Sequence, residues 1–322
     1  MSKEKISPEL DGEIRSILGC DMKEIITISD GLIHQTYEIK TDKGEYIFQI
    51  ADADKDKEKA LERKVSVFSK AEESGLRVPE LVTENVRVTK KNGERRKFYI
   101  VEKIPGKSLR EKNSPELAYN AGRKLADIHN IQKYEDTDWL MPEENGFRIQ
   151  QFEEGNLKNR ILSKTKEDVL ILKKNGFEEA GNKIQEIFKK YGENLPEEFR
   201  PVLCHNDYSP DNIITQNGKI TGIIDFDYAY SGHNQRDLVK AANSFWLEGL
   251  NVREEFYEGY SRSGKLEDSF EENEPLYRLE TLTRIIASIF ELKDEVDSRE
   301  KEEYSRKLNE TIQYSSLKLQ NN

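Results

Sequence analysis

Short runs rich in apolar and aromatic residues, separated by turn residues, recur along the first hundred positions. The runs are Ile25–Ile28, Ile33–Lys40, Glu45–Ile50, Val78–Val82 and Phe98–Val101. Short runs of this kind between turn residues predict β-strands. The polar segments 41–44 and 91–93 carry Gly or Asn-Gly and predict the connecting turns. This part of the chain is therefore expected to form a sheet.

Two segments in the same region have the spacing of helices instead. Ser7–Leu18 is amphipathic and predicts a leading helix, and Asp54–Ser74 places apolar residues every three or four positions. The second segment ends before Gly75, which suits the residue after a helix. Beyond about Pro105 the pattern is mostly helical, interrupted by one β-rich segment.

Composition narrows the class of protein. The 322 residues are 35% apolar and 35% charged, with 13 Phe and 14 Tyr, which is enough core material for a folded chain of two lobes. The net charge of −11 argues against a nucleic-acid partner, because phosphate binding requires a basic face. Cys20 and Cys204 form no disulfide pattern, and no membrane-spanning run or signal peptide is evident, so we expect a cytoplasmic protein with no membrane partner.

The β-rich segment contains the most informative residues of the chain. Cys204–Asn212 reads CHNDYSPDN, and Gly222–Asp227 reads GIIDFD. In the kinase catalytic loop, H-x-D-x-x-x-x-N, the Asp accepts the proton of the attacking hydroxyl and the Asn holds a metal ion, while a second Asp opening a D-F-G-like triplet holds the metal that bridges the phosphates. The corresponding residues are Asp207, Asn212 and Asp225, and hard oxygen ligands of this kind suit Mg²⁺.

Local sequence also predicts how these residues are held. Pro201–Cys204 and Asn212–Thr215 are short apolar runs, and Ile220–Ile224 returns after an Asn-Gly turn within Gln216–Lys219. We expect the three polar side chains at the mouths of adjacent strands. The alternative is a polar loop before a hairpin, since Asp, Asn, Ser and Pro are common in loops. The second triplet at the correct distance favours the functional interpretation.

With these motifs the chain resembles the family of aminoglycoside phosphotransferases and choline kinases. Tyr99–Leu109, Ala121–His129 and the segment from Gly232 to Leu238 are similar to the family's hinge, first C-lobe helix and post-metal helix. The resemblance implies an α+β, bilobal protein-kinase-like fold with an antiparallel-sheet N-lobe at 1–104 and a mainly helical C-lobe at 105–322. It also implies ATP and Mg²⁺ as cofactors and a small-molecule hydroxyl as acceptor.

The resemblance assigns further roles. Adenine would bind the hinge near Glu102 and Ile104, a loop around Gly31 would cover the phosphates, and His205 and Asp237 would brace the catalytic loop. Asp227 could face the metal, the substrate or only the turn. His129 is expected to be packed or to cap its helix, and four scattered histidines with two distant cysteines do not favour a zinc site.

The third strand departs from the kinase pattern. Kinases place a phosphate-binding Lys there and pair it with a Glu on the next helix. This chain has Gln49 on the strand and Lys64 on the helix, with Glu62 two residues earlier. Lys64 could supply the missing charge or be an ordinary exposed lysine. His34 lies in the segment Ser29–Tyr37 that would cover the phosphates, where family members often have Asn, and the alternative interpretation is a solvent-exposed loop histidine.

The acceptor is not determined by these residues, because the family includes kinases of sugars, amino alcohols and aminoglycosides. We favour a sugar or amino-alcohol hydroxyl. One alternative is a nucleotide-binding pseudokinase that regulates a partner, which the strand glutamine suggests. A protein kinase is disfavoured because no activation segment ending in Ala-Pro-Glu is evident.

Overall fold

The computed structural model describes residues 8–30, 34–52, 54–83, 86–91, 94–111, 114–143, 146–150, 154–293 and 295–321. The chain divides into two compact units. The first contains Met1–Ser108, Leu140–Arg148 and Asn212–Ala229, and the second contains Leu109–Trp139, Ile149–Asp211 and Tyr230–Asn322. Among the helices of the described ranges, none combines the length and apolar character that a membrane crossing requires.

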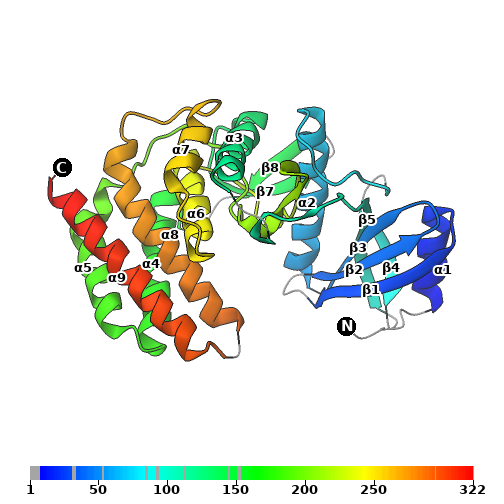
Figure 1. Cartoon of the computed structure of the whole chain (residues 1–322), viewed down its shortest axis with the longest axis horizontal. Coiled ribbons are helices and arrows are strands. Elements are labelled where there is room, and N and C mark those ends of the chain that lie inside the picture. The colour runs from blue at the N-terminus through cyan, green and yellow to red at the C-terminus, as the bar shows by residue number, and fades with distance from the viewer. Residues whose placement is uncertain are drawn as a thin grey trace. The chain divides into compact units, whose positions relative to one another are not determined.

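The first unit contains a five-stranded antiparallel sheet (Figure 1). In spatial order its strands are β1 (Met22–Asp30), β2 (His34–Thr41), β3 (Glu45–Ala51), β5 (Glu94–Glu102) and β4 (Arg87–Lys91). Helix α1 (Pro8–Leu18) buries Leu10, Ile14 and Leu18 against apolar side chains of this sheet, including Phe48 and Phe98. The apolar face of α1 and one face of the sheet thereby form a common core.

Helix α2 (Lys55–Glu73) lies in the same unit. It begins at Asp54, whose side chain accepts hydrogen bonds from the amides of residues 56 and 57, as a helix N-cap requires. Phe68 on its buried face makes edge-on contacts with Tyr99 of β5 and with Phe226. These contacts join α2 both to the large sheet and to the segment that follows the second sheet of this unit.

That second sheet has the strand order β11-β10-β6 and contains the predicted catalytic hairpin. Its strands are β10 (Ile213–Gln216), β11 (Lys219–Ile223) and β6 (Lys107–Ser108). The turn residues Asn217 and Gly218 have φ angles of 52° and 74°, which is the left-handed conformation that an Asn-Gly hairpin turn uses. The predicted turn is therefore confirmed.

The second unit is mainly helical. Its elements are η1 (Leu109–Glu111), α3 (Pro115–Ile131), α4 (Leu157–Lys174), α5 (Glu178–Tyr191), η2 (Gly192–Asn194), β9 (Val202–Cys204), η3 (Pro210–Asn212), β12 (Tyr230–Gly232), α6 (Asn234–Leu247), α7 (Arg253–Ser261), α8 (Phe270–Leu292) and α9 (Ser298–Asn321). The long helices α4, α5, α8 and α9 pack side by side around one large apolar core (Figure 1). Residue Asn212 of η3 belongs to the first unit.

Most predicted elements are confirmed. The structure has α1, β1, β2, β3, α2 and β5 at the predicted places, with Ser7 and Ile33 outside the described residues. The prediction of a strand at Val78–Val82 is wrong, because this segment makes one isolated β-bridge, between Leu81 and Val101. The strand beside β5 is instead β4, whose alternation is hidden by its many charged residues.

Two further expectations need correction. The region after Pro105 contains another strand pair, β7 (Asp138–Glu143) and β8 (Gly146–Gln150), which the helical interpretation missed. Strand β9, which leads into the predicted catalytic loop, pairs with β12 and not with β10. The predicted division at residue 104 stays a prediction, and the compact units differ from it because 140–148 and 212–229 group with the N-terminal part.

Candidate functional site

Gln49 and Lys64, the two residues that depart from the kinase pattern, belong to one polar cluster in the first unit. Lys64 is 1% exposed, and its Nζ donates a hydrogen bond to Oε1 of Gln49 at 3.1 Å. The same oxygen accepts a hydrogen bond from the Tyr99 hydroxyl, and Nε2 of Gln49 donates to Thr36 at 2.9 Å. Lys64 is therefore a buried residue and not an exposed helix lysine.

Two carboxylates complete the cluster. Nζ of Lys64 lies 2.8 Å from Oδ1 of Asp225 and 2.8 Å from Oδ1 of Asp227. Burial alone would lower the pKa of Lys64, but the two negative charges raise it well above its ordinary value. Lys64 is thus a charged ammonium that offsets two carboxylates.

The two carboxylates differ in how fully they are neutralised. Burial favours a higher pKa for Asp227, but Lys64 and His34 hold it below its ordinary value. Burial and the like charge of Asp227 raise the pKa of Asp225, although Lys64 opposes them. Asp227 is therefore the more firmly held anion, whereas the Asp225 side chain is 39% exposed.

The interpretation of His34 as a solvent-exposed residue is wrong. His34 lies on β2, is 3% exposed, and places Nε2 3.2 Å from Oδ1 of Asp227. No local pattern could indicate this contact, because the two residues lie 193 positions apart. Arg63, another residue that sequence reasoning missed, donates from Nη1 to the backbone oxygen of Asp227 at 2.8 Å and from Nε to that of Leu140 at 2.8 Å.

The backbone brings the two predicted metal ligands to one end of a hairpin. Ile213 pairs with Ile223, and the amide of Ile224 donates to the carbonyl of Asn212 at 3.0 Å. Asn212 directly precedes β10 and Asp225 lies two residues after β11, so both lie at the open end of the hairpin. Asp225 has a φ of 67°, a left-handed conformation that is uncommon outside glycine and clusters at functional sites. An amide and a partly exposed carboxylate are oxygen ligands of the kind that Mg²⁺ takes, so these residues fit that ion.

The second unit holds the predicted base in a loop braced from α6 and α3. Asp237 accepts hydrogen bonds from the amides of His205 and Asn206, both at 2.9 Å. The amide of Asp207 lies 3.3 Å from Nδ1 of His205. Nε2 of His129 lies 3.1 Å from Oδ2 of Asp237. Buried groups therefore hold the backbone on the N-terminal side of Asp207.

In the part of the chain that the structure describes, one His/Cys/Asp group could also suit a metal. The ligand atoms of His129, Cys204 and Asp237 all lie within 4.8 Å of one another. However, burial raises the pKa of the Cys204 thiol well above its ordinary value, and a metal requires the thiolate. Nδ1 of His129 is also 2.8 Å from the Tyr260 hydroxyl, so the histidine bridges two protein groups. This group is a hydrogen-bonded brace.

The remaining predicted nucleotide residues lie in the first unit. Glu102 ends β5, and its amide donates to the carbonyl of Glu80 at 2.9 Å. Ile104 packs against Gly222 of β11, where a Cβ atom would come within 2.3 Å of the isoleucine Cδ1. The close approach explains the glycine at this position. Gly31 lies outside the described residues.

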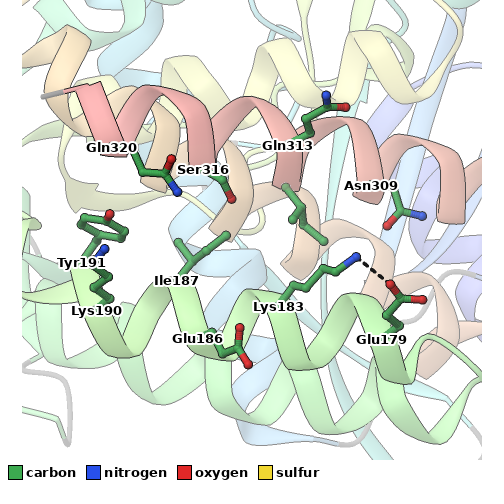
Figure 2. Close-up of a pocket in the computed structure, with 11 residues that line it drawn as sticks. Glu179, Lys183, Glu186, Ile187, Lys190, Tyr191, Asn309, Gln313, Ser316 and Gln320 are labelled. Carbon is green, nitrogen blue, oxygen red and sulfur yellow. Dashed lines mark hydrogen bonds and ion pairs between the residues drawn. The ribbon is translucent and has the colours of Figure 1, made fainter.

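A pocket elsewhere in the second unit contains none of these residues. It lies between α5 and α9 and measures about 770 Å³ (Figure 2). In Figure 2 the lining side chains from the two helices are mostly polar, and Lys183 and Glu179 form an ion pair 2.6 Å long. Their charges compensate each other, and we assign no function to this pocket.

The chain begins with an antiparallel sheet and helix α2, and it continues with an H-x-D loop held by Asp237 and with a mainly helical unit. This combination is typical of proteins with a protein-kinase-like fold. The model of the phosphotransferase enzyme family matches residues 24–272, so the chain belongs to this family. The α+β, protein-kinase-like fold that the resemblance implied is confirmed by solved structures that align over nearly the whole chain.

Three similar proteins illustrate the relationship. One is a thermostable mutant of aminoglycoside phosphotransferase APH(4)-Ia in ternary complex with ADP and hygromycin B, with a TM-score of 0.67, 13% identity, and coverage of 95% of this chain and 98% of that chain. Another is the amicoumacin kinase hAmiN with AMP-PNP, Ca²⁺ and Ami, with a TM-score of 0.64, 15% identity, and coverage of 96% and 94%.

The third is the homoserine kinase of Phenylobacterium zucineum (strain HLK1), which is 27% identical over 155 residues. The match covers 46% of this chain and 42% of that protein, so the chain spans less than half the length of this curated relative.

Proposed function

We propose that the protein is an ATP-dependent phosphotransferase that phosphorylates a hydroxyl group of a small metabolite. The observation that carries the proposal is that Asn212 and Asp225 lie at the same end of a hairpin and that Asp225 contacts the buried ammonium of Lys64. Oxygen ligands for a divalent cation and a fixed positive charge are what the phosphates of ATP require.

The residues of the first unit would hold the nucleotide. Asn212 and Asp225 would bind Mg²⁺, which when bound neutralises phosphate charge. Lys64 would attract the α- and β-phosphates in place of the strand lysine, and Gln49 would orient Lys64 through Oε1. The segment at Glu102 and Ile104 would bind adenine, and the segment with Gly31 would cover the phosphates. Asp227, paired with Lys64 and His34, would fix the lysine.

Asp207 would act as the general base. In the transfer, the acceptor oxygen forms a bond to the γ-phosphorus, the bond between that phosphorus and the ADP oxygen breaks, and the hydroxyl proton passes to the carboxylate. His205 and Asp237 would not touch the reactants. Their role would be to hold the loop, which agrees with the hydrogen bonds from the loop amides to Asp237.

The acceptor would be a sugar, an amino alcohol or an aminoglycoside-like molecule. The similar proteins include a homoserine kinase, an amicoumacin kinase and an aminoglycoside phosphotransferase. The names of these proteins point to different acceptors, so they support the type of reaction and do not narrow the acceptor to one class. A cytoplasmic setting stays a prediction from the sequence.

A panel of acceptors tests the proposal. ATP consumption would be measured with sugars, amino alcohols and aminoglycosides, and the phosphorylated product would be identified by mass spectrometry. The control is Asp207→Asn, which we expect to lower turnover by about 10²–10⁴-fold while ATP binding stays nearly unchanged. Turnover of this variant near the wild-type rate would refute the assignment of the base.

A second candidate is a nucleotide-binding pseudokinase that regulates a protein partner. It is favoured by Gln49, whose amide nitrogen already donates to Thr36 and whose oxygen accepts from Lys64. The two candidates separate in the same panel. If no acceptor raises ATP consumption above the Asp207→Asn rate while ATP still binds, the pseudokinase is the better interpretation.

A further inference from the structure

A lysine of α6 contacts the residue immediately before the proposed base. Nζ of Lys240 donates a hydrogen bond to the backbone oxygen of Asn206 and a second one, at 3.1 Å, to its side-chain Oδ1. Both acceptors belong to one residue, so the ammonium constrains the backbone and the side chain of Asn206 together. No motif in the sequence pointed to Lys240.

The backbone at Asn206 needs such a constraint. Its φ is 62°, in the left-handed region, which asparagine enters more readily than most residues but still at a cost in free energy. A residue in this conformation persists only where its surroundings enforce it. Because Asn206 precedes Asp207, its backbone sets the direction in which the carboxylate leaves the loop.

Two side chains one turn apart on α6 hold this conformation, one by binding backbone amides and the other by binding a backbone carbonyl. Asp237 accepts from the amides of His205 and Asn206, and Lys240 donates to the carbonyl of Asn206. Residues three apart share one face of a helix. A single rigid face therefore holds both the donor and the acceptor groups of the residue before Asp207.

Lys240 also belongs to a charged environment. Burial and the neighbouring Arg236 lower the pKa of Lys240 below its ordinary value, although the negative charges of Asp207, Asp237 and Glu280 oppose them. Asp207 is thus near enough for its charge to be felt by the lysine. A hydrogen bond from a charged donor in a buried site is stronger than one between neutral groups.

We propose that Lys240 is a positioning residue that locks Asn206 in its left-handed conformation and so orients Asp207 toward the acceptor hydroxyl. The inference rests on the proposed function of Asp207 as the base. Lys240 does not touch the reactants. Its contribution is to keep the carboxylate in one direction and to supply a positive charge beside it.

The test uses the full chain and three variants. Lys240→Met removes the charge and the donors at similar length, and Lys240→Arg restores both. The control is Lys307→Met, because Lys307 is a buried lysine that, like Lys240, donates to backbone oxygens, in its case those of Trp246 and Leu247 at the other end of α6. Thermal unfolding of all three shows how much each change costs in stability.

Amide hydrogen exchange gives a readout that does not need a substrate. We expect Lys240→Met to speed exchange at the amides of His205 and Asn206 by about tenfold or more, the loss typical of a charged hydrogen bond. Lys240→Arg should restore most of the protection, and Lys307→Met should leave it at the wild-type level. Unchanged exchange in Lys240→Met, or equal loss in Lys307→Met, would overturn the proposal.

Kinetics with an accepted substrate give the second readout. Lys240→Met should lower kcat by about tenfold or more with little change in KM for ATP, and the acid limb of the rate profile should move to higher pH because a cation beside Asp207 is lost. A change in KM alone would contradict the positioning role. If Asp207→Asn kept wild-type turnover, the proposed function would fail, whereas the exchange experiment would still decide the role of the lysine in holding the loop.

Discussion

Nζ of Lys64 on α2 lies 3.1 Å from Oε1 of Gln49 on β3. Compared with the kinase pattern of a lysine on the strand and a glutamate on the helix, the cation has moved to the helix and a neutral amide occupies the strand. The lysine also contacts Asp225 and Asp227, so the positive charge remains next to the carboxylate of the Asp-Phe-Asp triplet. A charge acts through its position, and either element can deliver it.

We expect Lys64→Ala to be a worse enzyme than Gln49→Ala. Loss of the glutamine removes an acceptor that orients Lys64 but leaves the ammonium in place, which should lower kcat/KM about tenfold, whereas loss of the lysine removes the positive charge itself. Steady-state kinetics on an accepted substrate would measure both. If both variants were as active as the wild type, neither residue would contribute to phosphate binding, and Mg²⁺ and the segment with Gly31 would bind the phosphates instead.

Exchanging the two residues tests the same relationship by double-mutant cycle. Gln49→Lys alone adds a second cation beside Lys64, and Lys64→Gln alone removes the only charge of the pair, so each should lose activity. The double variant restores one lysine and one amide and should recover part of the loss. Simple addition of the two single effects would indicate that the residues act independently.

Asp225 and Asp227 should respond to substitution in different ways. Asp225→Ala should weaken nucleotide binding far more with Mg²⁺ than with EDTA, because the partly exposed carboxylate would contact the metal. Asp227→Ala should instead destabilise the fold by about 3 kcal/mol, because it removes the buried carboxylate that contacts His34 and one of the two carboxylates that neutralise Lys64. Calorimetry with and without metal measures the first effect, and urea unfolding measures the second. Equal loss of binding with and without Mg²⁺ would make Asp225 structural.

Asp138 should make the stability of the protein depend on pH. Burial raises its pKa to about 6, with Glu154 acting in the same direction and the Trp139 amide and Arg160 opposing it. Since the folded pKa exceeds the ordinary value of 3.8, the contribution is fully present below about pH 4 and is lost as the pH rises through 6. Asp138→Asn should remove this loss. Urea unfolding between pH 4 and 7.5 would show it, and identical slopes in both proteins would contradict the assignment.

Two glycines should respond oppositely to alanine. In α7, a Cβ on Gly259 would lie 1.9 Å from the backbone oxygen of Tyr119 in α3, so Gly259→Ala should destabilise by about 1–3 kcal/mol or more. In α1, Gly12 has nothing within 4 Å, and Gly12→Ala should stabilise by about 0.5–1 kcal/mol through helix propensity. Thermal unfolding compares them directly. A neutral Gly259→Ala would mean that the two helices can separate without cost.

Local pattern determined much of the fold. Periodicity located α1, α2 and the strands β1, β2, β3 and β5, and the Asn-Gly turn placed the hairpin, because these features depend on residues close in sequence. The motif also indicated Asp207, Asn212 and Asp225, since their spacing along the chain is itself the signal. Strand β4 escaped because charged residues cover its alternation.

Only the tertiary structure decided which polar groups share a site. Sequence left Lys64 between a phosphate ligand and an exposed lysine and left solvent exposure open for His34, whereas both are buried against Asp227. It did not indicate Lys240 at all. These contacts join residues 34 to 193 positions apart, and their energies depend on burial and on opposing charges. No local pattern encodes such distances, so the charges that hold the site become visible only when the chain is folded.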